Sequence, residues 1–96
     1  MITVLGCGGF GKPNPKIIDQ NWKGAYFNQK YVWQVKNIGG SGDINFQITN
    51  KNDRSKQYSK TVYFERGEDR IVEIPVPVGT SEPSSDYLVK VVGLKN

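Results

Sequence analysis

The 96-residue chain contains no histidine and a single cysteine, Cys7. Without histidine it lacks the commonest general base and the commonest transition-metal ligand. This excludes a Ser-His-Asp or Cys-His nucleophile system within the chain, and one cysteine makes neither an internal disulfide nor a thiolate zinc site. Most carboxylates stand beside Lys or Arg, as in residues 65–70, which is typical of a solvated turn. We expect no enzymatic activity, no cofactor and no metal site.

Apolar residues that favour helices are scarce. Ala, Leu and Met together number five, against 18 Val and Ile, and eleven Gly and five Pro interrupt the rest. This composition excludes a helical bundle and predicts an all-β domain. No apolar run approaches the roughly 18 residues of a membrane-spanning helix. The apolar fraction of 36% is too high for a disordered chain and suits one domain with a single modest core.

Alternating apolar and polar residues predict six strands separated by turn-forming segments. The predicted strands are 16–22, 30–37, 43–49, 57–64, 70–76 and 87–91. Their number and spacing favour a sandwich or a barrel. Pro75 and Pro77 remove two backbone donors, so the fifth strand is expected to end at a sheet edge or a bulge.

The same alternation predicts which side chains form the core. In the first strand, Ile18, Gln20 and Trp22 are expected to share one face, with Ile17 and Asp19 on the other. The large core residues are predicted to be Trp22, Trp33, Phe46, Phe64 and Tyr87. Tyr87 follows a long polar loop and is expected to bond a nearby carbonyl through its hydroxyl, as in a tyrosine corner. Asn37 and Gly67 are expected at turns, Asn37 by bonding local backbone and Gly67 by adopting a positive φ.

Residues 1–15 differ in composition from the rest, so we expect a leader or tether there and a β-sandwich domain at 16–96. Residues 6–11 match the dinucleotide motif G-x-G-x-x-G. That motif requires a helix to begin directly after it, so that the helix amides meet the pyrophosphate. Lys12-Pro13-Asn14-Pro15 follows instead, and its two prolines disfavour helical geometry. We therefore reject a dinucleotide site.

Residues 4–7, VLGC, resemble the lipobox of bacterial lipoproteins. The resemblance implies that Cys7 becomes an acylated amino terminus and that a membrane is reached only through this lipid. The apolar stretch before it covers residues 2–5, whereas a signal needs about 7–15 apolar residues and a basic start. The alternative is that residues 2–5 form an edge strand and that Cys7 is an ordinary thiol.

Residues 31–92 carry a second resemblance. A strand ends in V-x-N-x-G at residues 35–39, another runs into the turn Arg66-Gly67-Glu68, and a late strand begins at Tyr87. In this order the motifs resemble the bacterial and archaeal immunoglobulin-like domains of the CARDB and FxLYD type. The resemblance implies an immunoglobulin-like (fibronectin type III-like) antiparallel sandwich of six to seven strands. It also implies a non-catalytic extracytoplasmic module, secreted or in the cell envelope, that mediates protein–protein interaction or adhesion.

Domains of this type often continue into another strand after the one that carries the tyrosine. Here either residues 1–11 supply that strand or the sandwich has an open edge. An open edge pairs readily with another chain. We therefore expect either self-association or the addition of a strand from a partner protein.

Two other binding functions remain open. The net charge of +4 and the 11 aromatic residues suit a small basic barrel of the OB type that binds single-stranded nucleic acid. Only residues 31–36 offer the required aromatics beside a cation, which argues against nucleic acid. The densest basic stretch, residues 51–60, is interpreted as a solvated hairpin tip. A carbohydrate-binding sandwich would use Trp22, Tyr26 and Phe27 as its platform.

Overall fold

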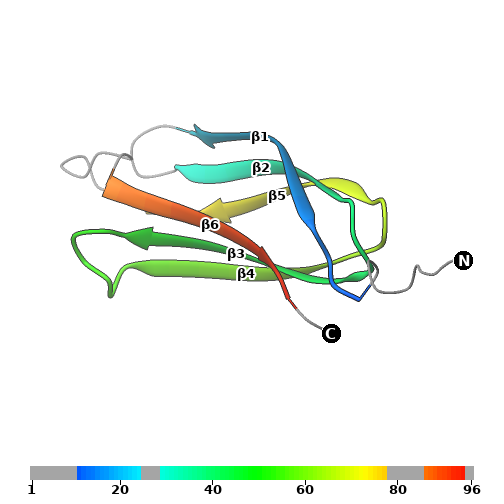
Figure 1. Cartoon of the computed structure of the whole chain (residues 1–96). Helices are drawn as coiled ribbons and strands as arrows, with labels where there is room; N and C mark the ends of the chain where they lie inside the picture. Colours follow the sequence, from blue (N-terminus) through cyan, green and yellow to red (C-terminus); the bar gives the residue numbers. More distant parts are fainter. Residues whose placement is uncertain (1–10, 25–28, 78–85, 95–96) are drawn as a thin grey trace, which may run out of the picture.

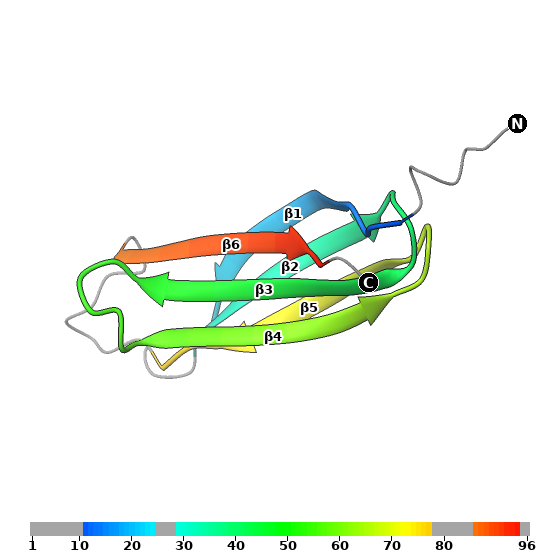
Figure 2. The same cartoon turned by 60° about the horizontal axis from the view of Figure 1, so that its bottom comes forward.

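The computed structural model describes residues 11–24, 29–77 and 86–94. They form six strands: β1 (Pro15–Lys23), β2 (Lys30–Asn37), β3 (Gly42–Asn50), β4 (Gln57–Phe64), β5 (Asp69–Pro75) and β6 (Tyr87–Gly93). All pairings are antiparallel, and the strands make two three-stranded sheets with the orders β1-β2-β5 and β4-β3-β6. The two sheets stack face to face (Figures 1 and 2). The predicted all-β sandwich is confirmed, and each strand lies where the alternation placed it, with β6 continuing to Gly93.

The core lies between the sheets and follows the period-two pattern. Ile44, Phe46 and Ile48 of β3 are all 0% exposed. Of the five large residues expected in the core, Trp33, Phe46, Phe64 and Tyr87 are buried. The fifth, Trp22, is half-buried and packs against the core edge-on to Tyr31 and Tyr87, at ring-centroid distances of 5.1 and 5.8 Å.

A β-bulge in β1 reverses part of the predicted alternation. The pairing with β2 passes from Ile17↔Val35 to Asp19↔Gln34, so Ile18 is an extra residue on β1. Ile17 packs against the core and Ile18 is 47% exposed. The prediction that Ile18 faces inward with Trp22 is wrong, because a bulge inserts one residue and shifts the alternation on one side of it.

Residues 12–15 are part of the domain and not of a tether. Pro13 is fully buried. The N–H of Gly40 donates to the carbonyl of Lys12 at 3.0 Å, and the N–H of Ile38 donates to the carbonyl of Asn14 at 3.0 Å. The predicted boundary after residue 15 therefore lies too late. Cys7 and the lipobox-like motif lie outside the described residues.

The side chain of Asn37 joins three segments at one end of the sandwich. Asn37 is 0% exposed. Its Oδ1 accepts hydrogen bonds from the N–H groups of Asn14 and Gly39, each at 3.0 Å. Its Nδ2 donates to the carbonyls of Gly40 at 2.9 Å and Glu65 at 3.2 Å. The local bond to Gly39 is the one expected from the sequence, whereas the bonds to Asn14 and Glu65 tie distant segments together.

The backbone of Asn37 completes this junction. Its N–H donates to the carbonyl of Glu68 at 2.9 Å, and its carbonyl accepts from the N–H of Gly67 at 2.8 Å. Gly67 has a φ of 80°, which confirms the predicted positive φ in the turn between β4 and β5. Both polar ends of the Asn37 side chain and both of its backbone groups are thus hydrogen-bonded.

We expect Asn37→Ala to lower the free energy of unfolding by about 3 kcal/mol, because buried backbone groups from three segments lose their hydrogen-bond partner. Urea unfolding followed by tryptophan fluorescence measures the change. The control is Asn45→Ala, which removes amide hydrogen bonds to Ser59 and Thr61 on the outer face of the sheet. The control should change stability by no more than about 0.5 kcal/mol. Equal losses in the two variants would contradict the special role of Asn37.

Candidate functional site

The two sheets leave four edge strands, which lie in two flanks. β4 lies beside β5 on one flank, and β1 lies beside β6 on the other (Figure 2). An edge strand presents backbone N–H and C=O groups that pair with another chain unless something blocks them. The way each edge is treated therefore distinguishes edges that are blocked from edges that are not.

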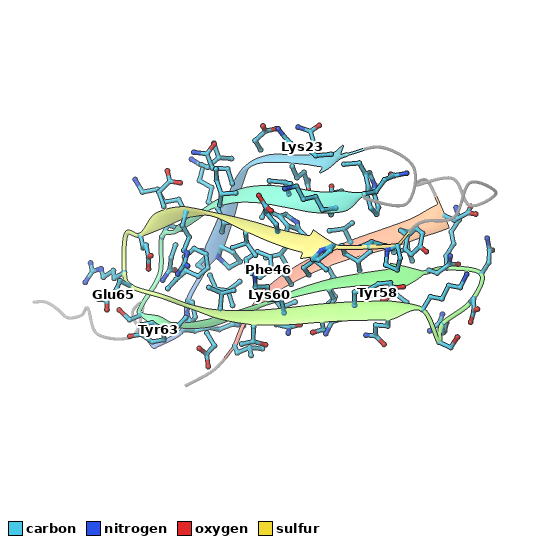
Figure 3. All side chains as sticks on the ribbon, turned by 180° about the vertical axis from the view of Figure 1, so that it is seen from behind. Lys23, Phe46, Tyr58, Lys60, Tyr63 and Glu65 are labelled. Carbon is cyan, nitrogen blue, oxygen red and sulfur yellow. The ribbon has the colours of Figure 1, made fainter. Side chains whose placement is uncertain are left out.

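On the first flank, Lys60 blocks pairing from an inward position of β4. It lies opposite Phe46, whose ring is in the core, so its register position faces the interior. Its Nζ donates to the backbone carbonyl of Glu73 on β5 at 3.4 Å. Figure 3 shows Lys60 and Phe46 between the ribbons of β4 and β5. An inward-pointing charge on an edge strand discourages edge-to-edge pairing.

Arg70 of β5 makes the reciprocal contact. It lies opposite Val35 in an inward register position. Its guanidinium donates to the backbone carbonyl of Tyr63 on β4 at 3.4 Å and lies 5.6 Å from the centre of the Phe64 ring. Each edge of this flank thus has a carbonyl occupied by a cation from the opposite sheet.

A proline protects the end of the edge strand β5, and a bulge protects β1, the other edge strand of the same sheet. β5 ends at Pro75, which has no N–H to offer, and the prediction that the prolines mark a sheet edge is confirmed. β1 carries the bulge at Ile18 and charged side chains at Lys16, Asp19 and Lys23. Both features discourage a regular pairing along β1.

β6 has none of these protections. Its sequence, YLVKVVG, contains no proline, and its pairing with β3 runs without a bulge. The register places Tyr87, Val89 and Val91 on the inward side and Lys90 on the outward side. The single charge of this strand therefore points away from the core and does not obstruct its edge.

Two hydrogen bonds beyond the ends of the β3–β6 ladder show which of its residue pairs are hydrogen-bonded. At one end the N–H of Leu94 donates to the carbonyl of Asp43 at 2.9 Å, and at the other the N–H of Lys51 donates to the carbonyl of Asp86 at 2.8 Å. Both pairs continue the register of the two strands. In an antiparallel ladder, hydrogen-bonded and non-hydrogen-bonded pairs alternate. The even-numbered residues of β6 therefore bond to β3.

Val89 and Val91 consequently direct their backbone N–H and C=O groups to the open side of β6. In residues 11–24, 29–77 and 86–94, no segment pairs with that side. Within the described part of the chain, β6 is thus an edge without these protections, and two of its valines have backbone groups that no described strand pairs with.

A basic recess of about 220 Å³ opens on the outer face of the same sheet, next to β6. Its lining residues are Gln47, Thr49, Asn50, Lys51, Arg54, Leu88 and Lys90. Three of them are cationic and none is a carboxylate. Leu88 is 58% exposed and gives the recess an apolar wall.

The buried Asn50 holds the loop that supplies part of this recess. Asn50 is 3% exposed, and its Oδ1 accepts from the N–H groups of Asn52 at 2.8 Å and Asp53 at 3.0 Å. Its N–H donates to the carbonyl of Lys56 at 3.0 Å. Hydrogen bonds from the hydroxyl and N–H of Ser55 hold the pKa of Asp53 below its usual value. The carboxylate of Asp53 is thus hydrogen-bonded within the loop.

Residues 51–55 are exposed in the loop between β3 and β4, which confirms the predicted solvated hairpin tip. Lys51 and Arg54 line the recess together with Lys90, which comes from a distant strand, whereas Lys60 lies on the opposite flank. Sequence reasoning missed Lys90 and Leu88, because only the pairing of β3 with β6 brings them to the loop. It also missed Lys60 as an edge residue, although a lysine in an inward position of a strand is a readable signal.

The aromatic residues of β2 that were considered for nucleic-acid binding are buried. Tyr31 is 9% exposed and Trp33 is 0% exposed, so the stretch 31–36 presents no exposed aromatic ring for stacking bases. The Nε1 of Trp33 has no hydrogen-bond partner among the described residues. Trp22 is half-buried between Tyr31 and Tyr87, and residues 26 and 27 lie outside the described part of the chain.

If Lys60 protects its edge, Lys60→Val should increase self-association relative to the unsubstituted chain, because β4 then presents an apolar edge. Sedimentation velocity over a range of concentrations measures the effect. The matched control is Lys36→Val, which removes an exposed lysine from the central strand β2. An unchanged sedimentation coefficient for Lys60→Val, or an equal increase in the control, would contradict this role.

The described ranges hold no group of three or more His, Cys, Asp or Glu residues arranged to bind a metal ion. Within the same residues, no helix is long and apolar enough to span a membrane. Comparison of the chain with protein-family models, with curated proteins and with solved structures finds no match in any of the three.

Proposed function

We propose that this chain is a non-catalytic protein-interaction module that receives an extended strand of a partner at the open edge of β6. The observation that carries the proposal is the contrast between β6 and the other three edges. Strand addition gains affinity from main-chain hydrogen bonds and specificity from side chains on alternate faces. The N–H and C=O groups of Val89 and Val91 would supply the main-chain hydrogen bonds, and the side chains along β6 would supply the specificity.

The proposal includes an immunoglobulin-like identity of the CARDB or FxLYD kind. Immunoglobulin sandwiches place strands A, B and E in one sheet and C, F and G in the other, and some types add a strand C′ to the second sheet. The order β1-β2-β5 is compatible with A-B-E, and β4-β3-β6 is compatible with C′-C-F. In that comparison the place beside β6 is the place of strand G. A partner strand at β6 would thus complete a seven-stranded sandwich.

We also propose an extracytoplasmic location, in the cell envelope or secreted. Its support is the resemblance of residues 4–7 to a lipobox and the resemblance of residues 31–92 to envelope domains. Acylation of Cys7 would tether the module to a membrane through its lipid. Because residues 12–15 pack into the fold, such a tether would be attached directly at the Asn37 end of the sandwich.

Val91→Pro tests strand addition without breaking the native ladder. Proline removes the N–H that points to the open edge, whereas the bonds to β3 come from the even-numbered residues. Extended peptides selected from a displayed random library on the full chain should bind Val91→Pro about tenfold more weakly. The control, Val91→Ala, keeps the N–H, loses part of the side chain that an added strand would cover, and should bind more tightly than Val91→Pro.

Circular dichroism and thermal unfolding establish that both variants are folded before binding is compared. Peptides that bind Val91→Pro as tightly as Val91→Ala would overturn strand addition at this edge. A selection that yields no peptide above background would overturn it as well.

A further inference from the structure

We infer that the strand received by β6 is an acidic segment of a different protein, and that Lys90, with Lys51 and Arg54 of the basic recess, selects it. The inference rests on the proposed strand addition and specifies the chemistry of the partner. Three observations carry it: the outward position of Lys90, the lack of carboxylates in the recess, and the charge of the chain itself.

The position of Lys90 brings its charge within reach of an added strand. Neighbouring strands lie about 4.8 Å apart, and directly opposite residues have Cβ atoms roughly 5 Å apart. The long side chain of Lys90 stands on the outer face of β6 and can meet a carboxylate on the same face of the added strand. Leu88, two residues away on that face, offers an exposed apolar surface to the next outward residue.

No carboxylate of the described residues lines the recess beside its three cations. Two cations of the β1-β2-β5 sheet have carboxylate partners: Lys30 contacts Glu73 at 2.9 Å, and Arg70 contacts Glu68 at 3.6 Å. Among the residues that the structure describes, Lys51, Arg54 and Lys90 form no ion pair. Their combined field reaches an adjacent strand, since screening acts over about 10 Å at 0.1 M salt.

The same charge argues against a second copy of this chain as the occupant. The chain has a net charge of +4. Pairing β6 with β6 of another copy would place two basic recesses on one continuous sheet. Like charges facing each other across strands destabilise the pairing, whereas an acidic partner is attracted and guided to its register.

The inward face of β6 adds a second requirement. Val89 and Val91 are only half-buried, so an added strand would cover them with its own inward side chains. The partner segment should therefore alternate. Its inward residues should be apolar, its outward residue opposite Lys90 should be acidic, and its outward residue opposite Leu88 should be apolar.

Two synthetic peptides of this alternating pattern test the inference, one with Glu and the other with Gln opposite Lys90. On the full chain at low salt, the Glu peptide should bind about fivefold more tightly than the Gln peptide, because it adds an ion pair in a basic field. Lys90→Gln should remove this preference and Arg54→Gln should reduce it. Lys36→Gln, an exposed lysine on the other sheet, is the matched control and should leave it unchanged.

The outcomes separate the inference from the proposed function. If both peptides bind equally and both are weakened by Val91→Pro, the acidic partner is overturned and strand addition stands. If neither peptide binds, or if the Glu peptide binds Val91→Pro and Val91→Ala equally well, strand addition is overturned and the inference falls with it. Dimerisation of the chain in sedimentation, abolished by Val91→Pro, would overturn the acidic partner in favour of a second copy.

Discussion

Two three-stranded sheets leave four edges of unpaired backbone, and this constraint governs how the molecule stays folded and where it can bind. A sandwich of this size has no covering helix among its described residues, so its edges are protected by side chains and by backbone irregularities. Lys60 and Arg70 each reach across to a carbonyl of the opposite sheet, so one flank is closed by reciprocal contacts. β1 is interrupted by its bulge. Because these protections are distributed unevenly, the described part of β6 differs from the other three edges, and the proposed strand addition rests on this difference.

Two buried asparagines organise the ends of the sandwich in a similar way. Asn37 and Asn50 each end a strand, and each accepts two backbone N–H bonds through its Oδ1. A short polar side chain can do this where the strand ladder stops, because it supplies an acceptor that water would otherwise provide. The consequences differ, since Asn37 secures three distant segments whereas Asn50 shapes the loop that carries Lys51 and Arg54.

The strands and most of the core could be predicted from the sequence, because burial on one face imposes a period of two that is visible residue by residue. The faces of Ile17 and Ile18 could not, since a bulge depends on how β1 pairs with β2 and leaves two adjacent isoleucines equally plausible. That residues 12–15 belong to the domain could not be predicted either. It depends on the close approach of Pro13 to Gly93, which are far apart in the sequence. The basic recess could not be predicted either, because its residues come together only when β3 pairs with β6. The alternation of apolar and polar residues predicts the strands. Contacts between strands can be predicted only when the arrangement of the strands in space is known.

Lys90 illustrates how one charge can have opposite effects depending on the face it occupies. A lysine in an inward position, such as Lys60, is held at the flank and obstructs pairing at that edge. A lysine in an outward position leaves the backbone of its strand accessible and acts only on the side chains of a neighbouring strand. On β6 this arrangement would penalise pairing with a second basic chain and favour an acidic one. An edge can thus be open to a partner and still be protected against self-association, because selectivity comes from the outer face and affinity from the backbone.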